Sequence, residues 1–229
     1  MKKINLGCGP VGKNDWLNID WGVLAFLHTS PLFLKLLTMF RLLPAEYNVK
    51  WPGNLKLYDC RKKLPFEDSS VDYIYTSHFL EHLKRFEAEK ILKECWRVLK
   101  DGGILRVVVP DLGIILKKYA EKDKQFFIDA FYRDNREVAK NLTLADLLSG
   151  VFYPEANKLR PTRFKKIAAL FIRPHLSMYD SDSLTQLLRS AGFKTIEKKK
   201  YREGNVPDLE VLDVFPETSI YLEARKEKS

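Results

Sequence analysis

The chain is poor in cysteine: its 229 residues include only Cys8, Cys60 and Cys95. These cysteines are odd in number and show no Cys-x-x-Cys spacing, so the sequence supports neither a disulfide framework nor a cysteine-based zinc site. A reducing compartment is therefore expected. The first predicted strand begins at Ile4, which leaves no room for the apolar core of a signal peptide before it. We expect a cytoplasmic protein.

Long hydrophobic runs are also lacking. A bilayer-spanning helix needs about 20 consecutive apolar residues. The nearest candidate, 22–44, is rich in leucine and phenylalanine but is interrupted by Pro31, Lys35 and Arg41. We expect two short helices there, separated at Thr29-Ser-Pro31. This insertion forms either a hydrophobic mouth for a lipid-linked or amphipathic ligand or only a satellite core.

Several functional signatures are absent as well. The sequence has no internal repeat, no low-complexity linker and no recognisable RNA-binding module, Arg-Gly tract or base-flipping motif. Its acids and histidines lack a recognisable ligand spacing, so no metal site is expected. The net charge of +9 predicts only nonspecific attraction to nucleic acid.

What is present is the composition of one folded domain, with 45% apolar and 12% aromatic residues. The positive charge is uneven. Residues 156–174 contain no acid but six bases, Lys158, Arg160, Arg163, Lys165, Lys166 and Arg173. Apolar residues between them share a helical face, which predicts an amphipathic basic helix. That helix either binds an anionic membrane or a phosphate-bearing substrate, or packs on its own domain with solvated lysines.

The first twenty residues carry the most specific pattern. A short apolar strand ends in Gly7-Cys8-Gly9, and a second apolar run ends in Asp20. Glycines at the carboxyl end of a strand let the backbone approach a ligand, and an acid at the next strand tip can accept hydrogen bonds from a ribose diol. The pair indicates an adenosine-containing cofactor.

The rest of the chain continues as alternating strands and helices. The predicted elements are a strand over 55–60 that contains Asp59, strands 71–75 and 104–109, a helix 87–99, a helix capped by Ser181 or Asp182 and ended by Gly192, a strand after Phe193 and a last strand 219–225.

These segments resemble the core of class I methyltransferases that use S-adenosylmethionine. The resemblance rests on Ile4-Asn-Leu-Gly-Cys-Gly, Trp16-Leu-Asn-Ile-Asp, the Leu64-Pro-Phe loop, Ser77-His-Phe-Leu-Glu-His-Leu and the run from Arg97 to Arg106. It is closest to the type 11 kind associated with tailoring of surface polysaccharides, and it covers about two-thirds of the chain. It implies a Rossmann-like, doubly wound, seven-stranded, mostly parallel α/β sheet with an antiparallel last strand. Helical lid insertions are expected at 22–50 and 121–174 of this single domain.

The resemblance also implies a cofactor site. The Gly7-Cys8-Gly9 backbone would cradle the methionine end, Asp20 the ribose and Asp59 the adenine amino group, although Asp59 could instead cap the turn before Leu64. The remaining implied cofactor residues are Cys60, Ser77 and His78. The sequence departs from the family pattern at 10–16, which is too short for the helix that normally follows the glycine loop. Lys13 or Asn14 could compensate for the missing helix dipole.

If the acceptor is a hydroxyl, a side chain should take its proton, and His78 and His175 are our candidate bases because histidine titrates near neutrality. His82 is expected one turn inside a helix as a structural residue. Further candidates for that proton are Glu81, Tyr179 and Asp180, and Tyr179, Arg163 and Lys166 are the candidate acceptor-binding residues. The leading hypothesis is O-methylation of a sugar or another small polar or anionic acceptor, lipid-linked or displayed at a membrane. RNA methylation and a non-catalytic cofactor-binding or membrane-associated adaptor remain alternatives.

Overall fold

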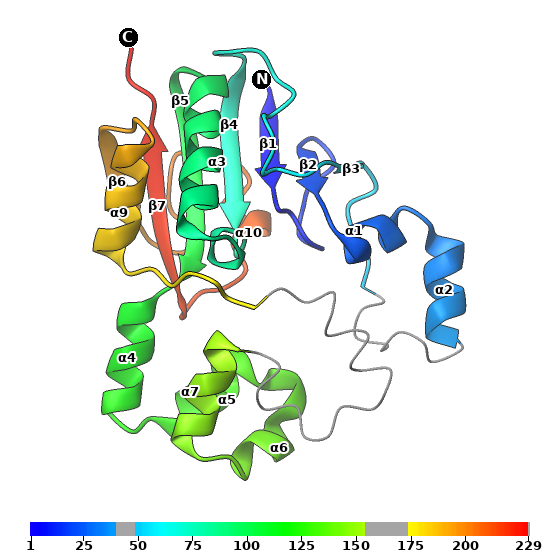
Figure 1. Ribbon diagram of the computed structural model, residues 1–229, viewed down its shortest axis with the longest axis vertical. Helices are drawn as coiled ribbons and strands as arrows, with labels where there is room; N and C mark the ends of the chain where they lie inside the picture. The colour runs from blue at the N-terminus through cyan, green and yellow to red at the C-terminus, as the bar shows by residue number, and fades with distance from the viewer. Residues whose placement is uncertain (40–48, 154–173, 229) are drawn as a thin grey trace.

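The structure is a computed structural model, and it describes residues 1–39, 49–153 and 174–228. Its centre is a seven-stranded sheet in the order β3-β2-β1-β4-β5-β7-β6 (Figure 1). The strands are β1 (Lys3–Leu6), β2 (Leu17–Asp20), β3 (Leu55–Leu57), β4 (Val71–Ser77), β5 (Leu99–Pro110), β6 (Thr195–Lys199) and β7 (Ser219–Arg225).

Six strands run in one direction, and β7 is antiparallel to both of its neighbours, β5 and β6. The predicted fold class, a Rossmann-like and mostly parallel α/β sheet with an antiparallel last strand, is thereby confirmed. Because parallel strands end at one edge, the ends of β1, β2, β3 and β4 meet there, as a ligand site requires.

Helices cover both faces of the sheet, and further helices lie beyond the carboxyl ends of its parallel strands. They are α1 (Val23–His28), α2 (Pro31–Met39), α3 (Arg85–Val98), α4 (Leu112–Ala120), α5 (Lys124–Phe131), α6 (Arg136–Lys140), α7 (Leu144–Phe152), α9 (Ser181–Ser190) and α10 (Leu209–Leu212), with 3-10 turns η2 (Leu80–His82) and η3 (Arg133–Asn135).

One face of the sheet is covered by α3 and α9 (Figure 1). In α3 the buried residues are Ala88, Ile91, Leu92, Cys95 and Val98, a three-to-four spacing that places one apolar stripe against the strands. Burial of this stripe accounts for helix formation in a segment whose other positions are mostly charged or polar.

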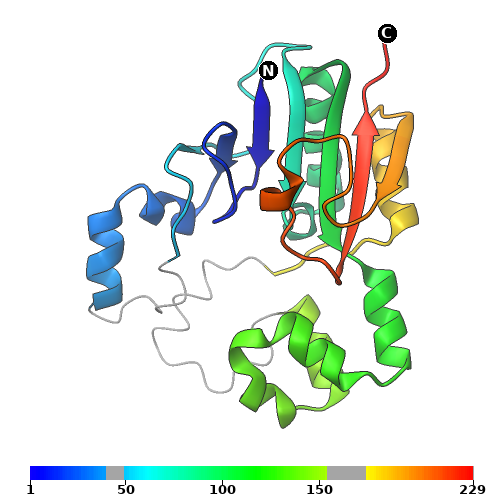
Figure 2. The ribbon, with the colours of Figure 1, turned by 180° about the vertical axis from the view of Figure 1, so that it is seen from behind.

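The opposite face is covered by the segment 200–218, which includes α10 (Figure 2). As predicted, no helix forms between β1 and β2 in the described chain. Trp16 fills the space instead: it is 1% exposed and meets Tyr75 edge-on, with 6.4 Å between ring centroids. Lys13 does not face the glycine loop as a substitute for that helix; it pairs with Asp208 from the covering segment.

Three local predictions need correction. β3 ends at Leu57, so Asp59 lies in the turn beyond the strand. The cap of α9 is Asp180, whose carboxylate accepts from the Ser183 N–H at 2.8 Å, and not Ser181 or Asp182. His82 ends the 3-10 turn η2 and does not lie within an α-helix.

The two insertions lie at or beside the carboxyl edge of the sheet. The helices α5 to α7 form a small core of their own beyond this edge (Figure 1), around Phe127, Leu147 and Val151. Near β2 and β3, α1 and α2 form on either side of Thr29 and Ser30, and they expose Phe26, Leu32 and Phe33. Among the described residues, no helix has the length and apolar character needed to cross a membrane.

A buried cation organises the back of the sheet. Arg106 on β5 is fully buried and donates to Asp213 at 2.6 Å and to Glu223 at 3.3 Å. It also donates to the carbonyl oxygens of Lys200 and Glu203. A buried charge is tolerated only when it is paired and hydrogen-bonded, so these contacts fix the covering segment in place.

We expect Asp213→Ala to lower the free energy of unfolding by about 3 to 5 kcal/mol, because it leaves Arg106 buried with only part of its compensation. Urea denaturation followed by circular dichroism measures this loss. Glu210→Ala, an exposed acid on the same segment, is the matched control and should change stability by less than about 0.5 kcal/mol. Equal effects of the two changes would contradict the assigned role of the network.

Asp208 predicts a pH dependence of stability. Burial opposes its ionisation, but hydrogen bonds from Lys13, Trp16 and Lys3 outweigh burial and hold its pKa well below the ordinary 3.8. A depressed folded-state pKa stabilises the fold above the unfolded-state value, and that stabilisation is lost as pH falls through the folded-state value. Asp208→Asn should therefore be less stable than the wild type at neutral pH, with a gap that narrows below pH 3.8. Urea titrations across this range test it, and a constant gap would refute it.

Candidate functional site

The glycine loop after β1 has the open backbone that the sequence predicted. Gly7 and Gly9 have φ of 64° and 51°, in the left-handed region that favours glycine. A Cβ on Gly7 would lie 2.4 Å from the ring of Phe79, whereas a Cβ on Gly9 would meet nothing within 4 Å. The main chain at Gly9 therefore faces open space where a ligand can approach.

Two hollows flank this loop, and together they are lined by every residue predicted to bind the cofactor. One hollow contains Gly7, Asp20, Asp59 and Cys60. The other, a cavity of about 160 Å³, contains Gly7, Cys8, Gly9, Ser77 and His78. Residues from four strand ends are thus brought to one place. The structure gathers these residues, and their individual roles toward the cofactor remain predictions.

In the hollow that contains Asp20 and Asp59, the two acids have different hydrogen-bond partners. The Asp20 carboxylate accepts from the Gly9 N–H at 2.7 Å and so joins the tip of β2 to the glycine loop. Asp59 is held by Arg61 through two side-chain bonds of 2.8 Å and caps its own turn through the Arg61 N–H. The Arg61 guanidinium holds the pKa of Asp59 below its ordinary value. The capping interaction weighed at the sequence level is therefore present, and contact with an adenine amino group would add to it.

The two cysteines of this site are buried thiols. Burial raises the pKa of Cys60 to about 12 and raises that of Cys8 as well. Thiols with raised pKa values stay protonated and unreactive near neutral pH. Any contribution to a cofactor therefore comes from their main chain and from their small size, as the resemblance implies.

His78 occupies a strained position at the end of β4. Its φ is 49°, an unusual value for a residue other than glycine, and its ring lies 3.9 Å from that of Phe215 between centroids. Nε2 is 3.0 Å from the Ser219 hydroxyl oxygen, and Nδ1 is 3.3 Å from Oε1 of Glu81. The hydroxyl of the neighbouring residue Ser77 is buried and has no hydrogen-bond partner among the described residues.

The tertiary structure adds a cluster that sequence reasoning did not identify as a unit. Glu81, His82 and His175 meet just beyond β4, although the ligand spacing in the sequence suggested no such group. His175 is partly buried, and this burial lowers its pKa, so its imidazole is neutral at neutral pH. The available signal was the run His78-x-x-Glu81-His82, a spacing known from metal sites, but its partner His175 comes from a distant part of the chain.

Of the three residues predicted to bind the acceptor, the structure describes only Tyr179. Tyr179 is only 1% exposed and packs in the main core, and its contact with an acceptor stays a prediction. Its backbone is needed for structure, because its carbonyl accepts from the Leu112 N–H. Arg163 and Lys166, with the rest of the predicted basic helix, lie outside the described residues.

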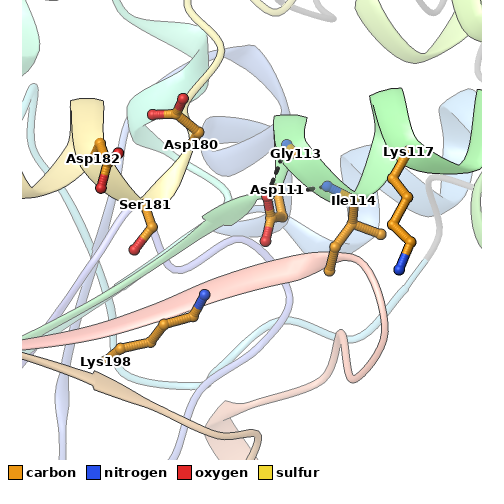
Figure 3. Close-up of a pocket in the computed structure, with 8 residues that line it drawn as sticks. All are labelled: Asp111, Gly113, Ile114, Lys117, Asp180, Ser181, Asp182 and Lys198. Atoms are coloured by element: carbon orange, nitrogen blue, oxygen red, sulfur yellow. Dashed lines mark hydrogen bonds between the residues drawn. The ribbon is translucent and has the colours of Figure 1, made fainter.

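A third hollow, of about 310 Å³, lies where α4 and α9 begin (Figure 3). Two of its three acids cap helices: Asp111 accepts from the N–H groups of Gly113 and Ile114, and Asp180 caps α9. The other side chains of the lining include Lys117, Asp182 and Lys198. This hollow does not include the glycine loop, and it is lined by caps that stabilise the two helices.

The Asp20 carboxylate provides a direct test of the cofactor site. If it holds a ribose, Asp20→Ala should weaken binding of S-adenosylmethionine by about 1.5 to 3 kcal/mol, the worth of hydrogen bonds to a charged group. Isothermal titration calorimetry measures the change. Asp101→Ala, an exposed acid outside both hollows, is the control. Unchanged affinity in the Asp20 variant would show that the second strand tip does not contact the cofactor.

Comparison with known proteins agrees with this geometry. The model of a methyltransferase domain family matches residues 4–107, a span from β1 into β5 that contains the glycine loop, Asp20, Asp59 and His78. No curated protein matched the sequence significantly.

Solved structures with a similar course of the backbone include three archaeal proteins. An S-adenosylmethionine-dependent methyltransferase from Methanosarcina mazei is 19% identical, with 100% of this chain and 93% of that one covered and a TM-score of 0.48. A protein from Pyrococcus horikoshii is 16% identical, with 99% and 82% covered and a TM-score of 0.49. A methyltransferase from Archaeoglobus fulgidus is 13% identical, with 98% and 86% covered and a TM-score of 0.47.

The residues present fit S-adenosylmethionine: the space at Gly9 is open, an acid follows β2, and Ser77 offers an unpartnered hydroxyl at the end of β4. Strand order, glycine loop and the matched domain lead to the same conclusion. Residues 4–107 match a methyltransferase domain, and the chain is an S-adenosylmethionine-dependent methyltransferase with a Rossmann-like fold.

Proposed function

We propose that this methyltransferase acts on a hydroxyl oxygen of a sugar or another small polar or anionic acceptor. The observation that carries the proposal is the position of His78. His78 lines the same cavity as Gly7, Cys8 and Gly9. Its Nδ1 atom faces the buried carboxylate of Glu81. A hydroxyl acceptor must lose a proton during methyl transfer, and this pair is suited to take it.

In this proposal each ring nitrogen of His78 has its own role. With Nδ1–H directed at Oε1 of Glu81, 3.3 Å away, Nε2 is the proton acceptor. The Ser219 hydroxyl, 3.0 Å from Nε2, marks where an acceptor hydroxyl can form the same contact. Glu81 fixes the tautomer and stabilises the imidazolium after proton transfer, as a carboxylate does beside a catalytic histidine.

The cofactor supplies an activated methyl group on a sulfonium, so the protein mainly orients the two reactants and excludes water. The open main chain at Gly9 and the Asp20 carboxylate hold one reactant, and the cavity wall formed by His78 and Phe215 borders the other. Proton removal by Nε2 as the oxygen attacks completes the reaction, with S-adenosylhomocysteine as the second product.

Charge and exposed apolar side chains support the class of acceptor. The net charge of +9 favours an anionic acceptor, such as a nucleotide sugar or a phosphoglycan. The exposed Phe26, Leu32 and Phe33 of α1 and α2 suit a lipid-linked acceptor at a membrane surface. Tailoring of a surface polysaccharide is the setting that these features and the sequence motifs favour.

The test is a kinetic comparison with His78→Asn, chosen because asparagine tolerates the left-handed backbone at this position. We expect kcat to fall by about 10²- to 10⁴-fold, the usual contribution of a general base. Formation of S-adenosylhomocysteine is measured with nucleotide sugars, phosphoglycans and short RNA as acceptors.

His28→Asn is the matched control, since His28 stacks on Trp51 outside both hollows at the glycine loop. Cofactor affinity of both variants is measured by calorimetry, so that a loss of cofactor binding is distinguished from a loss of kcat. Full activity of His78→Asn would exclude His78 as the base, and turnover restricted to RNA would replace the small-acceptor proposal.

A further inference from the structure

Three metal-ligating side chains converge beside the end of β4. One ligand atom from each of Glu81, His82 and His175 lies within 4.8 Å of the ligand atoms of the other two. Glu81 and His82 are the last residues of the η2 turn, whereas His175 precedes α9. The imidazole rings of His82 and His175 lie 5.0 Å apart between centroids. The cluster therefore depends on the tertiary fold, not on one helix face.

The inner atoms of this cluster lack hydrogen-bond partners. Glu81 is 0% exposed, and neither of its carboxylate oxygens makes a hydrogen bond within the described chain. Nδ1 of His78, at 3.3 Å from Oε1, is the ion-pair neighbour of this carboxylate. Nδ1 of His175 is also buried without a partner. Buried polar atoms left in this state cost free energy, and a bound cation would remove that cost at all three atoms.

The backbone holds the cluster in shape. The N–H groups of Leu176 and Ser177 donate to the Glu81 carbonyl oxygen at 2.7 and 3.1 Å. The Ser177 hydroxyl donates to the Leu83 carbonyl oxygen at 2.8 Å. His175 is thereby fixed beside Glu81 through its own neighbours. A site whose ligands are positioned before binding loses little entropy when the ion arrives.

The outer ring nitrogen of His82 has a suitable neighbour. Nδ1 lies 3.3 Å from the carbonyl oxygen of Pro174. Metal-ligating histidines usually donate their second ring N–H to a carbonyl or carboxylate, which sets the tautomer and orients the ring. This contact leaves Nε2 of His82 for a cation.

We propose that Glu81, His82 and His175 bind a divalent transition-metal cation such as Zn²⁺ or Mn²⁺. Two imidazoles and one carboxylate suit this class of ion and leave coordination positions open. Mg²⁺ and Ca²⁺ fit less well, because they prefer oxygen ligands. His82 and His175 are only partly buried, so the ion can enter from solvent.

A role in catalysis rests on the proposed function. His78 connects the proposed metal site with the cofactor cavity, because it contacts Glu81 and lines the cavity at the glycine loop. An acceptor hydroxyl in an open coordination position would lose its proton more readily. Nε2 of His78 takes that proton, the oxygen forms a bond to the methyl carbon, and the electrons of the breaking C–S bond return to sulfur. The reaction needs no further reactant.

The experiment is calorimetry of ZnCl₂ and MnCl₂ into the full chain after removal of metal with a chelator and dialysis. The wild type should bind one ion of at least one of these metals per chain. His82→Gln and His175→Gln should each weaken that binding at least about tenfold. His28→Gln, which removes a histidine outside the cluster, is the matched control and should bind like the wild type. The visible spectrum of bound Co²⁺ should change in the two cluster variants and not in the control.

Thermal melts establish that each variant is folded, and having two ligand variants keeps the test decisive if one of them is not. No binding to the wild type, or equal binding to wild type and both variants, would overturn the site. Methylation of a hydroxyl acceptor by metal-free protein would overturn its catalytic role and leave the proposed function intact. Metal binding together with turnover on RNA alone would overturn the proposed function and leave the site intact.

Discussion

The buried guanidinium of Arg106 is the interaction on which the cofactor side of this molecule depends. It lies in the middle of β5 and pairs with Asp213. Because Arg106 is fully buried, water cannot replace Asp213 as its partner. Its bonds to main-chain oxygens of Lys200 and Glu203 fix the segment 200–218 over the sheet. The same segment carries Asp208, which binds Lys3 on β1 and the indole N–H of Trp16. One buried charge is thus linked, through a covering segment, to the chain that leaves the glycine loop.

This linkage explains how the fold does without a helix after the glycine loop. In most doubly wound sheets that helix covers one face and directs its N-terminal N–H groups at the ligand. Here Trp16 and α10 provide the cover, and Asp208 anchors the connection. We expect recognition of the cofactor to rely on the open main chain at Gly9, on the acid that ends β2 and on the acid beyond β3. The loss of the helix dipole is a difference in electrostatics and leaves the placement of the loop intact.

The proposed acceptor side depends on the buried Glu81 carboxylate. Burial opposes its ionisation, but the neighbouring imidazoles of His78 and His82 outweigh burial and hold its pKa below the ordinary value. The charged form is the one that needs a partner, and the groups that face it in the described part of the chain are the imidazoles of His78, His82 and His175. A neutral imidazole can take a proton or ligate a metal ion, and an ammonium can do neither. In the proposed mechanism, this choice of partners gives the end of β4 a chemical role as well as a structural one.

The sequence by itself determined the order of strands and helices, the open glycine loop and the acids at the strand ends, because these features depend on short-range patterns of apolar residues, glycines and caps. It also predicted correctly that 10–16 is too short for a helix. The boundaries of β3 and of the turn at His82 were decided by hydrogen bonds to neighbouring segments, and so local preference missed them. The contact of Asp208 with Lys3, the burial of Tyr179 and the meeting of Glu81 with His175 were decided only by the tertiary structure. Each joins residues far apart in the chain, and a pattern along the sequence carries no record of which distant side chains the closing of the sheet brings together.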